Sequence, residues 1–528
     1  MNDELRYLAA RAAAGRLNRR AFLGRAAALG ATSVAANTLL SGAARAAGPK
    51  NGGTLTMGLG GGQSTDSLDP ALAASQVPYM YLQTAGDRLT DVAPDGSIMM
   101  KLAEEVSSSK DAKTWTFKIR KGVTFQNGKP LTADDVKQTM ERHSDKNSKS
   151  GALGIMKGIA SMKVDGDNFV VELHTANADL PYLMSDYHLV IQPGGGMDDP
   201  MAGIFAGPYK IKHFEPGVRI VFEKYPEYWD KDVGHYDTIQ MLVINDSTAR
   251  NAALQSGQVQ MVNSVEPRVA DLLKRAPHME VAVTSGRGFY CFNMFCNTKP
   301  FANNDLRMAL KLGIDREELV KKILAGYGSV GNDMPVNKAY PLFDDTIPQR
   351  TYDPDKARHH LKKSGYDGKI VLLTADGAFS GAVDAAQLYQ QSAAKAGIKI
   401  TVQRAPNDGY WTEVWNKKPF AASYWGGRPT QDQMYSTAYI SSAAWNDTRF
   451  KDPKFDKIIV EARGELDKAK RKEMYREAGM IIRDHGGLIN PMFNQFLNAF
   501  DNTKVAGWEA NPNGDMMNGL AGVLCYQA

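Results

Sequence analysis

The residue types that most often carry catalysis are present in this chain, but without the spacing that catalysis needs. The stretch 327–331 reads Tyr-Gly-Ser-Val-Gly and lacks the first glycine of a nucleophile elbow, and the sequence has no HExxH zinc motif and no P-loop. The stretch 58–63 lacks the last glycine of a dinucleotide-binding fingerprint. His359 and His360 are neighbours, so on a helix they diverge by ~100° and do not chelate one metal together. These patterns favour binding over catalysis, and we expect no enzyme activity, no cofactor and no metal site.

The excess positive charge of the chain is concentrated at its start. Of 528 residues, 63 are Lys or Arg and 58 are Asp or Glu. Residues 1–46 contain seven arginines and two acids, which leaves 56 basic and 56 acidic residues in the remainder. A neutral body gives no support to nucleic-acid binding through a basic face. The length exceeds what one hydrophobic core usually supports, so we expect two or three lobes.

Residues 1–46 have the features of an export signal. Arg19-Arg20 precede Phe22-Leu23, an uncharged Ala-rich stretch of 15 residues runs over 26–40, and Ala44-Arg45-Ala46 fits a cleavage site. The stretch is shorter than the roughly 20 residues needed to span a bilayer. The paired arginines resemble the twin-arginine signal, which exports folded proteins across a bacterial inner membrane. An amphipathic helix and a general secretory signal are the alternatives. Because no later segment reaches span length, we expect a soluble mature protein without a membrane span.

Alternating strands and capped helices predict the α/β class. Apolar residues alternate with polar ones over 55–59 and 115–119, and hairpins are expected around 165–167 and 215–217. Helix starts are expected at Thr132, at Asp246 or Ser247, at Asp315 and at Asp353. Cys291 and Cys296 lie five residues apart in an expected strand over 289–297, so they point to opposite faces. We therefore expect these two cysteines and Cys525 to be free thiols.

Four sequence blocks, in order along the chain, carry a resemblance to one family. The first block reads Thr-Trp-Thr-Phe-Lys-Ile-Arg-Lys-Gly-Val-Thr-Phe at 114–125, with Leu-Thr-Ala-Asp-Asp-Val at 131–136. The second block reads Gly-Pro-Tyr at 207–209, with Phe-Glu-Lys-Tyr-Pro-Glu-Tyr-Trp at 222–229. The third block is Phe301 with Asp-Leu-Arg-Met-Ala-Leu at 305–310 and Ile-Asp-Arg at 314–316, and the fourth is Tyr-Asp-Pro-Asp-Lys-Ala at 352–357. Together, behind an export signal, they resemble the periplasmic solute-binding proteins of the dipeptide/oligopeptide class of ABC importers, extracellular solute-binding protein family 5. The resemblance covers nearly the whole mature chain.

The resemblance implies a two-lobed α/β periplasmic-binding-protein fold of the cluster C type, with an additional α/β domain inserted in the first lobe. The implied parts are lobe I at 47–91, 194–290 and 488–528, the inserted domain at 92–193, and lobe II at 291–487. Trp115, Phe117 and Trp229, which belong to the family-like blocks, are expected to pack in cores rather than contact a ligand.

The resemblance also indicates where a ligand would lie. Dipeptide-binding relatives hold the amino group of the peptide with an aspartate and its carboxylate with an arginine. Here Gly427 falls at the aspartate position and Ala378 or Phe379 at the arginine position, so both anchors are expected to be missing. The side chains expected to line the cleft instead are Trp411, Tyr424, Trp425 and Phe379 as aromatic walls, Arg428 as a cation, and Asp376 and Asp432 as acids.

Each of these side chains suits one kind of ligand group. Arg428 suits a carboxylate or phosphate, either acid suits an amine, and the ring faces suit a cation. The alternatives are that Trp411 is a core residue, that Arg428 pairs with a surface acid, and that Asp376 caps a turn before Gly377.

The function implied by the resemblance is the periplasmic substrate-binding component of an ABC importer. Such a protein captures a peptide or small polar amino-acid-like solute by hinge closure and delivers it to the membrane permease, which is its expected partner. We expect a monomer in the periplasm that binds no nucleic acid. Two alternatives remain open: an exported hydrolase with a non-contiguous catalytic site on an α/β scaffold, and a non-transport binding module such as a chemoreceptor partner or a carrier of haem or metal.

Overall fold

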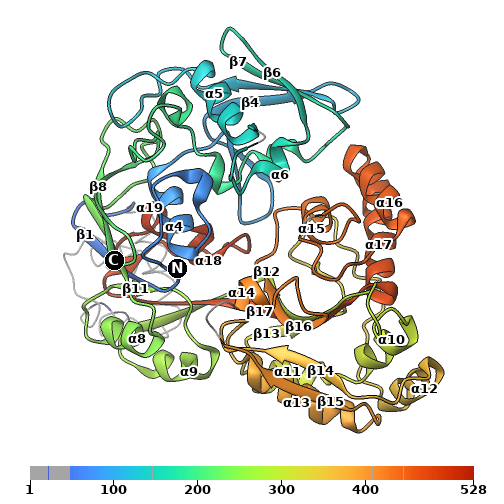
Figure 1. The fold of residues 1–528 in the computed structure, drawn as a ribbon. Coiled ribbons are helices and arrows are strands. Elements are labelled where there is room, and N and C mark those ends of the chain that lie inside the picture. The colour runs from blue at the N-terminus through green and yellow to red at the C-terminus, as the bar shows by residue number, and fades with distance from the viewer. Residues whose placement is uncertain (1–21, 23–25, 27–47, 146, 407–409, 444) are drawn as a thin grey trace.

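Two long strands, β12 (Met279–Met294) and β17 (Leu488–Asp501), run through the centre of this computed structural model and connect its two halves (Figure 1). They pair antiparallel, and their register shifts between Ser285 and Phe289. The structure describes Phe22, Ala26 and residues 48–145, 147–406, 410–443 and 445–528. The expected export signal therefore lies outside the described residues, apart from those two positions.

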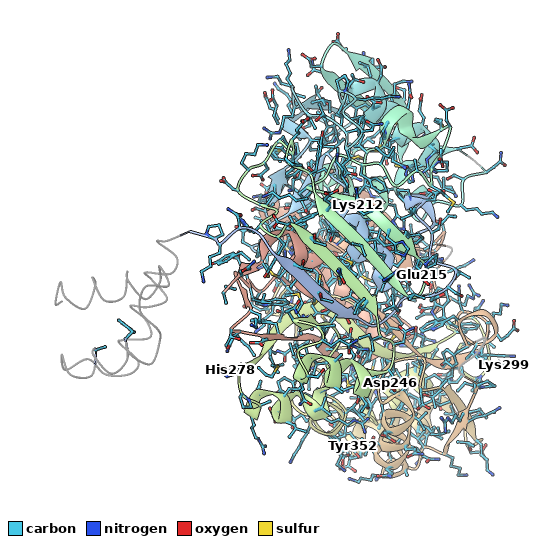
Figure 2. All side chains as sticks on the ribbon, turned by 90° about the vertical axis from the view of Figure 1, so that its left-hand side faces the viewer. Lys212, Glu215, Asp246, His278, Lys299 and Tyr352 are labelled. Atoms are coloured by element: carbon cyan, nitrogen blue, oxygen red, sulfur yellow. The ribbon has the colours of Figure 1, made fainter. Side chains whose placement is uncertain are left out.

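In the described part of the chain, eleven strands form one mixed sheet around this central pair. The strand order is β15 (Ile400–Arg404), β14 (Ile370–Thr374), β16 (Phe420–Trp425), β12, β17, β11 (Met261–Val262), β1 (Thr54–Leu59), β10 (Thr238–Val243), β9 (Arg219–Lys224) and β8 (Tyr209–Glu215), with β13 (Gly328–Val330) beside β17. β8 forms one edge of this sheet and carries the exposed charged side chains of Lys212 and Glu215 (Figure 2). Charged side chains on an edge strand discourage pairing with a second chain.

A separate four-stranded antiparallel sheet lies above the main sheet in Figure 1. Its strands, in order, are β4 (Ala103–Ser108), β5 (Thr114–Ile119), β7 (Asn168–Leu173) and β6 (Ile159–Asp165). Two small two-stranded sheets pair β2 (Thr90–Val92) with β3 (Ile98–Met100) and β18 (Val505–Ala506) with β19 (Tyr526–Gln527). The four-stranded sheet falls within the range predicted for the inserted domain.

Helices cover these sheets. The α-helices are α4 (Gln76–Ala85), α5 (Ala133–Ser144), α6 (Leu153–Met156), α7 (Leu180–Leu183), α8 (Ser247–Gln255), α9 (Pro267–Arg275), α10 (Asn304–Leu312), α11 (Arg316–Lys322), α12 (Pro354–Ser364), α13 (Ala382–Ala394), α14 (Tyr410–Glu413), α15 (Gln431–Ala438), α16 (Pro453–Gly464), α17 (Lys468–His485), α18 (Asp515–Asn518) and α19 (Ala521–Leu524). The described residues also form the short 3-10 helices η1 (Pro70–Leu72), η2 (Tyr187–Leu189) and η3 (Pro193–Gly196). Within the described residues, no helix is long and apolar enough to cross a membrane.

The predicted helix starts and hairpins are confirmed. Side chains of Thr132, Asp246, Asp315 and Asp353 each accept a hydrogen bond from a backbone N–H in the first turn of the helix that follows. Both predicted hairpins form, β6 with β7 and β8 with β9. The alternation of apolar residues therefore identified the core faces of these strands, as expected for a half-buried strand.

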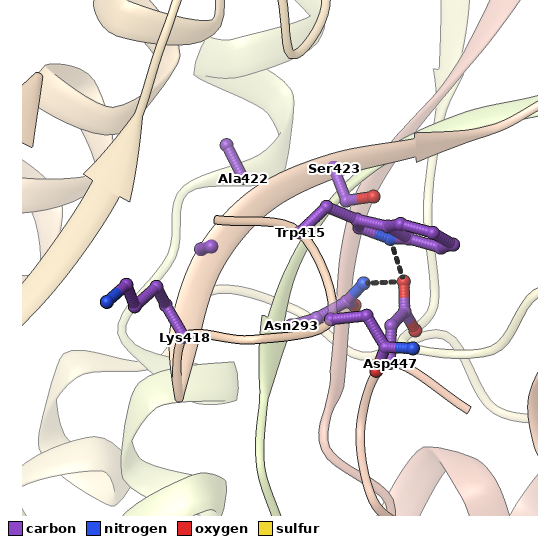
Figure 3. A pocket seen from close by; sticks show the side chains of 8 residues that line it. Asn293, Trp415, Lys418, Ala422, Ser423 and Asp447 are labelled. Atoms are coloured by element: carbon purple, nitrogen blue, oxygen red, sulfur yellow. Dashed lines mark hydrogen bonds between the residues drawn. The ribbon is translucent and has the colours of Figure 1, made fainter. Parts of the chain in front are cut away.

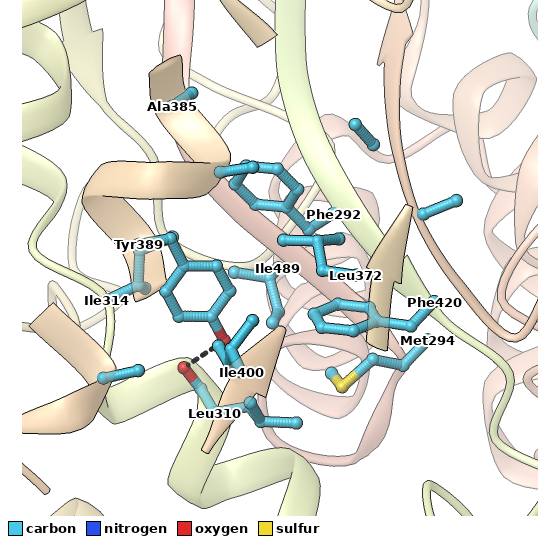
Figure 4. Packing of buried hydrophobic residues seen from close by; sticks show 14 of the residues in the cluster. Phe292, Met294, Leu310, Ile314, Leu372, Ala385, Tyr389, Ile400, Phe420 and Ile489 are labelled. Carbon is cyan, nitrogen blue, oxygen red and sulfur yellow. Dashed lines mark hydrogen bonds between the residues drawn. The ribbon is translucent and has the colours of Figure 1, made fainter. Parts of the chain in front are cut away.

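Buried side chains form separate hydrophobic clusters on either side of the central strands. One packs α10, α11 and α13 against β14 and β16, and its Tyr389 hydroxyl donates to the Leu310 carbonyl at 2.9 Å (Figure 4). Another packs α4 against β1, β8 and β10. A third lies under the four-stranded sheet and contains Trp115 and Phe117, with Trp229 half-buried against it. The chain is thus mixed α/β, while the exact division into lobes remains a prediction.

One sequence expectation differs from the structure. β12 ends at Met294, so Cys296 lies beyond the strand that was expected over 289–297. Ser329, the serine of the incomplete elbow motif, lies within β13 and pairs with β17, in keeping with the missing first glycine of that motif. All three cysteines are free, as expected, with Cys291 and Cys525 buried.

Candidate ligand-binding site

Five aromatic side chains gather where β16 ends. Edge-to-face contacts join Trp411 to Tyr424, with ring centroids 5.3 Å apart, and Trp411 to Trp415, 6.0 Å apart. Trp415, Trp425 and Trp445 lie mutually within 6.0 to 6.4 Å. We call these five residues the aromatic cluster. Offset and edge-to-face packing of this kind is the favoured arrangement of aromatic rings, so the cluster is a preformed surface.

The aromatic cluster has a buried base and an exposed rim. Trp425 is only 5% exposed, whereas Trp411, Tyr424 and Trp445 are exposed by 37%, 49% and 49%. Three large exposed rings in contact with buried ones form a surface suited to binding an apolar or cationic group. Trp415 and Trp445 were not among the predicted residues. The available signal was that four of the seven tryptophans fall between 411 and 445.

Below the rings lies a buried carboxylate. One oxygen of Asp447 accepts hydrogen bonds from the Asn293 amide at 2.8 Å, the Trp415 indole at 2.9 Å and the Trp425 indole at 3.2 Å; Figure 3 draws the first two. The other oxygen of Asp447, Oδ1, is buried and has no partner in the described part of the chain; the same holds for Asn293 Oδ1 and Ser423 Oγ. These side chains line a small hollow that is partly open to solvent. Burial raises the pKa of Asp447 to about 6.

Arg428 follows β16, and its side chain lies against the aromatic cluster. Its guanidinium carbon lies 5.6 Å from the centroid of the Trp425 ring, and Nη1 donates to the Gly427 carbonyl at 2.7 Å. No ion pair joins Arg428 to an acid among the residues that the structure describes. The positive charge of Arg428 also lowers the pKa of Asp186. Burial alone would raise the pKa of Asp186, but His188 and Arg428 outweigh it and hold that pKa below its usual value. Arg428 is therefore a cation available to an anionic group.

The other three predicted residues are occupied within the protein. Asp376 forms an exposed ion pair with Arg404, and the buried Asp432 pairs with Arg463 at 3.0 Å. Phe379 is 6% exposed and stacks on a tyrosine ring with centroids 4.4 Å apart. The structure thus brings together Trp411, Tyr424, Trp425 and Arg428, and it places Asp376, Asp432 and Phe379 in contacts of their own.

The backbone at Gly427, where dipeptide-binding relatives are expected to carry the aspartate, favours glycine. Gly427 has φ of +84°, in the left-handed region that favours glycine. A Cβ at this position would lie 2.4 Å from Cβ of Arg287, closer than any real contact. Ala378, the alternative position for the carboxylate anchor, is fully buried. A side chain at Gly427 would therefore collide with Arg287, and neither Gly427 nor Ala378 carries a charged group that could hold an end of a peptide.

A family model matches residues 97–447 of the chain. It describes bacterial extracellular solute-binding proteins, family 5 Middle. The chain belongs to this family. Among curated family 5 relatives, it is 26% identical over 463 residues to Di/tripeptide-binding protein 1 of Pseudomonas aeruginosa, covering 80% of this chain and 86% of that protein. It is 25% identical over 473 residues to the glutathione-binding protein GsiB of Salmonella choleraesuis, covering 85% of this chain and 90% of that protein.

Solved structures share the family 5 fold. The periplasmic binding protein AgaA in complex with agropinic acid, from A. tumefacien R10, matches with a TM-score of 0.78 at 23% identity, covering 90% of this chain and 99% of that chain. DppA from Helicobacter pylori, in complex with the peptide STSA, matches with a TM-score of 0.79 at 22% identity and the same coverage. The expected fold is therefore confirmed, and the family is one of solute-binding proteins. None of these relatives supports the hydrolase alternative, and no group of three or more potential metal ligands is found in the described ranges.

Proposed function

We propose that this chain is the periplasmic substrate-binding component of an ABC importer, and that it takes a small peptide-like or amino-acid-like solute carrying an anionic group. The observation that carries the proposal is Arg428 over the Trp425 ring of the aromatic cluster, whose Tyr424 and Trp411 rings are exposed, on a chain of family 5. The guanidinium would bind a carboxylate bidentately, and the rings would cover the apolar part of the solute. The relatives named for di- and tripeptides and for glutathione support this class of solute.

In this proposal the protein is a monomer whose two lobes close on the solute. The strands β12 and β17 bend at the point where their register shifts. Closure favours the bound state only through contacts that the solute makes in the closed form. No bond of the solute is made or broken, and the protein passes it unchanged to the permease.

The first experiment identifies the solute and tests whether Arg428 contributes to its affinity. Mass spectrometry of material that co-purifies with the mature protein gives candidates, and calorimetry is run with the dipeptide Met-Leu, glutathione and agropinic acid as defined probes. For the probe that binds, Arg428→Ala is expected to weaken affinity roughly ten- to a hundredfold, because a hydrogen bond to a charged group contributes about 1.5–3 kcal/mol. Tyr424→Ala, a change at an exposed ring, is expected to weaken it less.

The matched control is Arg358→Ala, which removes an exposed arginine of α12 that pairs with Asp355. It should leave affinity unchanged. Full affinity in Arg428→Ala would reject the proposed site, and recovery of a chemically altered probe would reject solute capture in favour of the hydrolase.

A further inference from the structure

The inserted domain touches lobe II at a place away from the aromatic cluster. The Ala178 N–H, from the loop before α7, donates to the Arg463 carbonyl near the end of α16 at 2.8 Å. One residue later, the carboxylate of Asp179 forms an ion pair with Arg471 of α17. The side chains of Asp179 and Arg471 are only 6% and 9% exposed. We call these four residues the interdomain contact. Figure 1 shows α16 and α17 along the outer side of lobe II, with α14 and β16 nearer the middle.

Lobe II holds its half of the contact rigidly. Arg471 also donates to the Tyr475 hydroxyl, from Nε at 3.2 Å and from Nη2 at 3.0 Å. Arg463 is fixed in turn, because its Nε donates to both oxygens of Asp432 at 3.0 and 3.1 Å. From the inserted domain, Asp179 supplies the carboxylate that pairs with the Arg471 side chain, which Tyr475 already holds in place. Burial would lower the pKa of Arg471, but the charge of Asp179 outweighs that effect and raises it.

The contact lies between parts of the chain that separate if the protein opens. Asp179 is followed by Leu180, which belongs to the core under the four-stranded sheet, whereas Tyr475 belongs to a core of lobe II. No residue of the interdomain contact belongs to the aromatic cluster or is Arg428. Its formation therefore needs no solute.

We propose that Asp179 and Arg471 form a clasp that holds the inserted domain on lobe II in the absence of solute, so that the closed form is populated before solute binds. When the lobes part, both charges return to water, so an intact pair opens reversibly. When one partner is replaced, the other charge remains buried and unpaired in the closed form alone, and this strongly disfavours closure. Since apparent affinity scales with the populated fraction of the binding-competent form, the clasp sets affinity without touching the solute.

The test uses solute-free protein, so its result is independent of which solute is bound. Small-angle X-ray scattering measures the radius of gyration, and hydrogen exchange measures protection of the Ala178 amide. Arg471→Gln is expected to enlarge the radius of gyration and to speed exchange at Ala178. Adding Asp179→Asn to Arg471→Gln removes the unpaired buried charge as well as the attraction, so the double variant is expected to have a radius of gyration between those of Arg471→Gln and the parent protein; a double variant as compact as the parent would overturn the clasp.

The matched control breaks an ion pair between the same two helices that does not cross to the inserted domain. Lys454 of α16 and Glu477 of α17 pair at 2.6 Å and are exposed, so Glu477→Gln should change neither measurement. If Arg471→Gln fails to fold by circular dichroism, Asp179→Asn alone, measured in the same way, carries the test. An unchanged radius and unchanged Ala178 exchange in the folded variant would overturn the clasp, even if the solute site is confirmed.

Discussion

At the scale of single residues, Asp447 is the least expected feature of the site. It is a carboxylate 1% exposed, and it is held by three neutral donors at one oxygen and by none at the other. No ion pair joins it to a cation in the described part of the chain. A buried carboxylate without a cation is expensive to keep ionised, and this cost is what raises its pKa to about 6. The hydrogen bonds from Trp415 and Trp425 to Asp447 therefore depend on the protonation state of this carboxylate, and so on pH.

The first prediction concerns Asp447→Asn and the pH dependence of stability. The folded state holds the proton up to about pH 6, whereas an unfolded aspartate loses it near pH 4. Between these values the folded state binds more protons, so the free energy of unfolding falls as pH rises through this window. Asparagine does not titrate, so we expect the decrease in the free energy of unfolding between pH 4 and pH 6 to be smaller in Asp447→Asn by up to about 3 kcal/mol. Urea unfolding at several pH values measures this free energy.

The control for this prediction is Asp95→Asn. Asp95 is exposed, and the hydrogen bonds it accepts from Ser97 lower its pKa, so its linkage to stability has the opposite sign. Asp515, whose pKa burial also raises to about 6, stays in both variants and keeps part of the slope. An unchanged slope in Asp447→Asn would mean that Asp447 has the same pKa in the folded and unfolded states, which would contradict the prediction.

The site was only partly predictable from the sequence at this scale. Tyr424, Trp425 and Arg428 follow one another along β16 and its end, so position in the family located them together. Trp445 and Asp447 reach the same place from a loop, and only tertiary packing brings them there. Asp376 and Asp432 were chosen for their charge alone, and sequence does not reveal that each already has an arginine partner.

At the scale of elements, local signals were reliable where both the start and the periodic face of an element were visible. α5 is an example. Thr132 Oγ1 accepts from the Asp135 N–H at 3.3 Å, and the Asp135 carboxylate accepts from the Thr132 N–H at 2.9 Å. β12 shows where such signals fail. Gly286 and Gly288 interrupt its alternation, the register shifts there, and only the part from Phe289 onward was recognisable as a strand.

The second prediction tests the start of α5. Thr132→Ala removes the side-chain acceptor for the Asp135 N–H and the hydroxyl that donates to the Asp135 carboxylate, while the Thr132 N–H still donates to that carboxylate. We expect a loss of about 1 kcal/mol in the free energy of unfolding. The midpoint of urea unfolding should fall while its slope stays the same. Thr65→Ala, at a loop threonine that caps no helix, serves as the control and should lie within about 0.5 kcal/mol of the parent. An equal loss in both variants would contradict the capping role.

At the scale of the whole molecule, the class of fold was predictable but its assembly was not. Alternation and caps predict α/β elements, yet they do not say that β12 and β17 run through both halves of one sheet. The core around α4, β1 and β10 also takes residues from β17 and α19, which lie more than 400 positions after α4 and β1 in the chain. Contacts of such sequence separation leave no local pattern. The resemblance to a family supplied this information, since it carries the topology with it.

The last prediction tests the twin-arginine route expected from the sequence, and it belongs to the whole molecule because that route carries proteins that have already folded. Arginine presents a planar fork of donors that lysine lacks, so a receptor that reads Arg19-Arg20 should not accept a pair of lysines in their place. We expect the double variant Arg19→Lys, Arg20→Lys to stay in the cytoplasm as a folded, solute-competent protein. Cell fractionation with immunoblotting measures this. Arg16→Lys, outside the pair, should be exported normally. Export of the double variant at the parent level would instead favour a general secretory signal, which depends on the charge and the apolar stretch and not on the arginine pair.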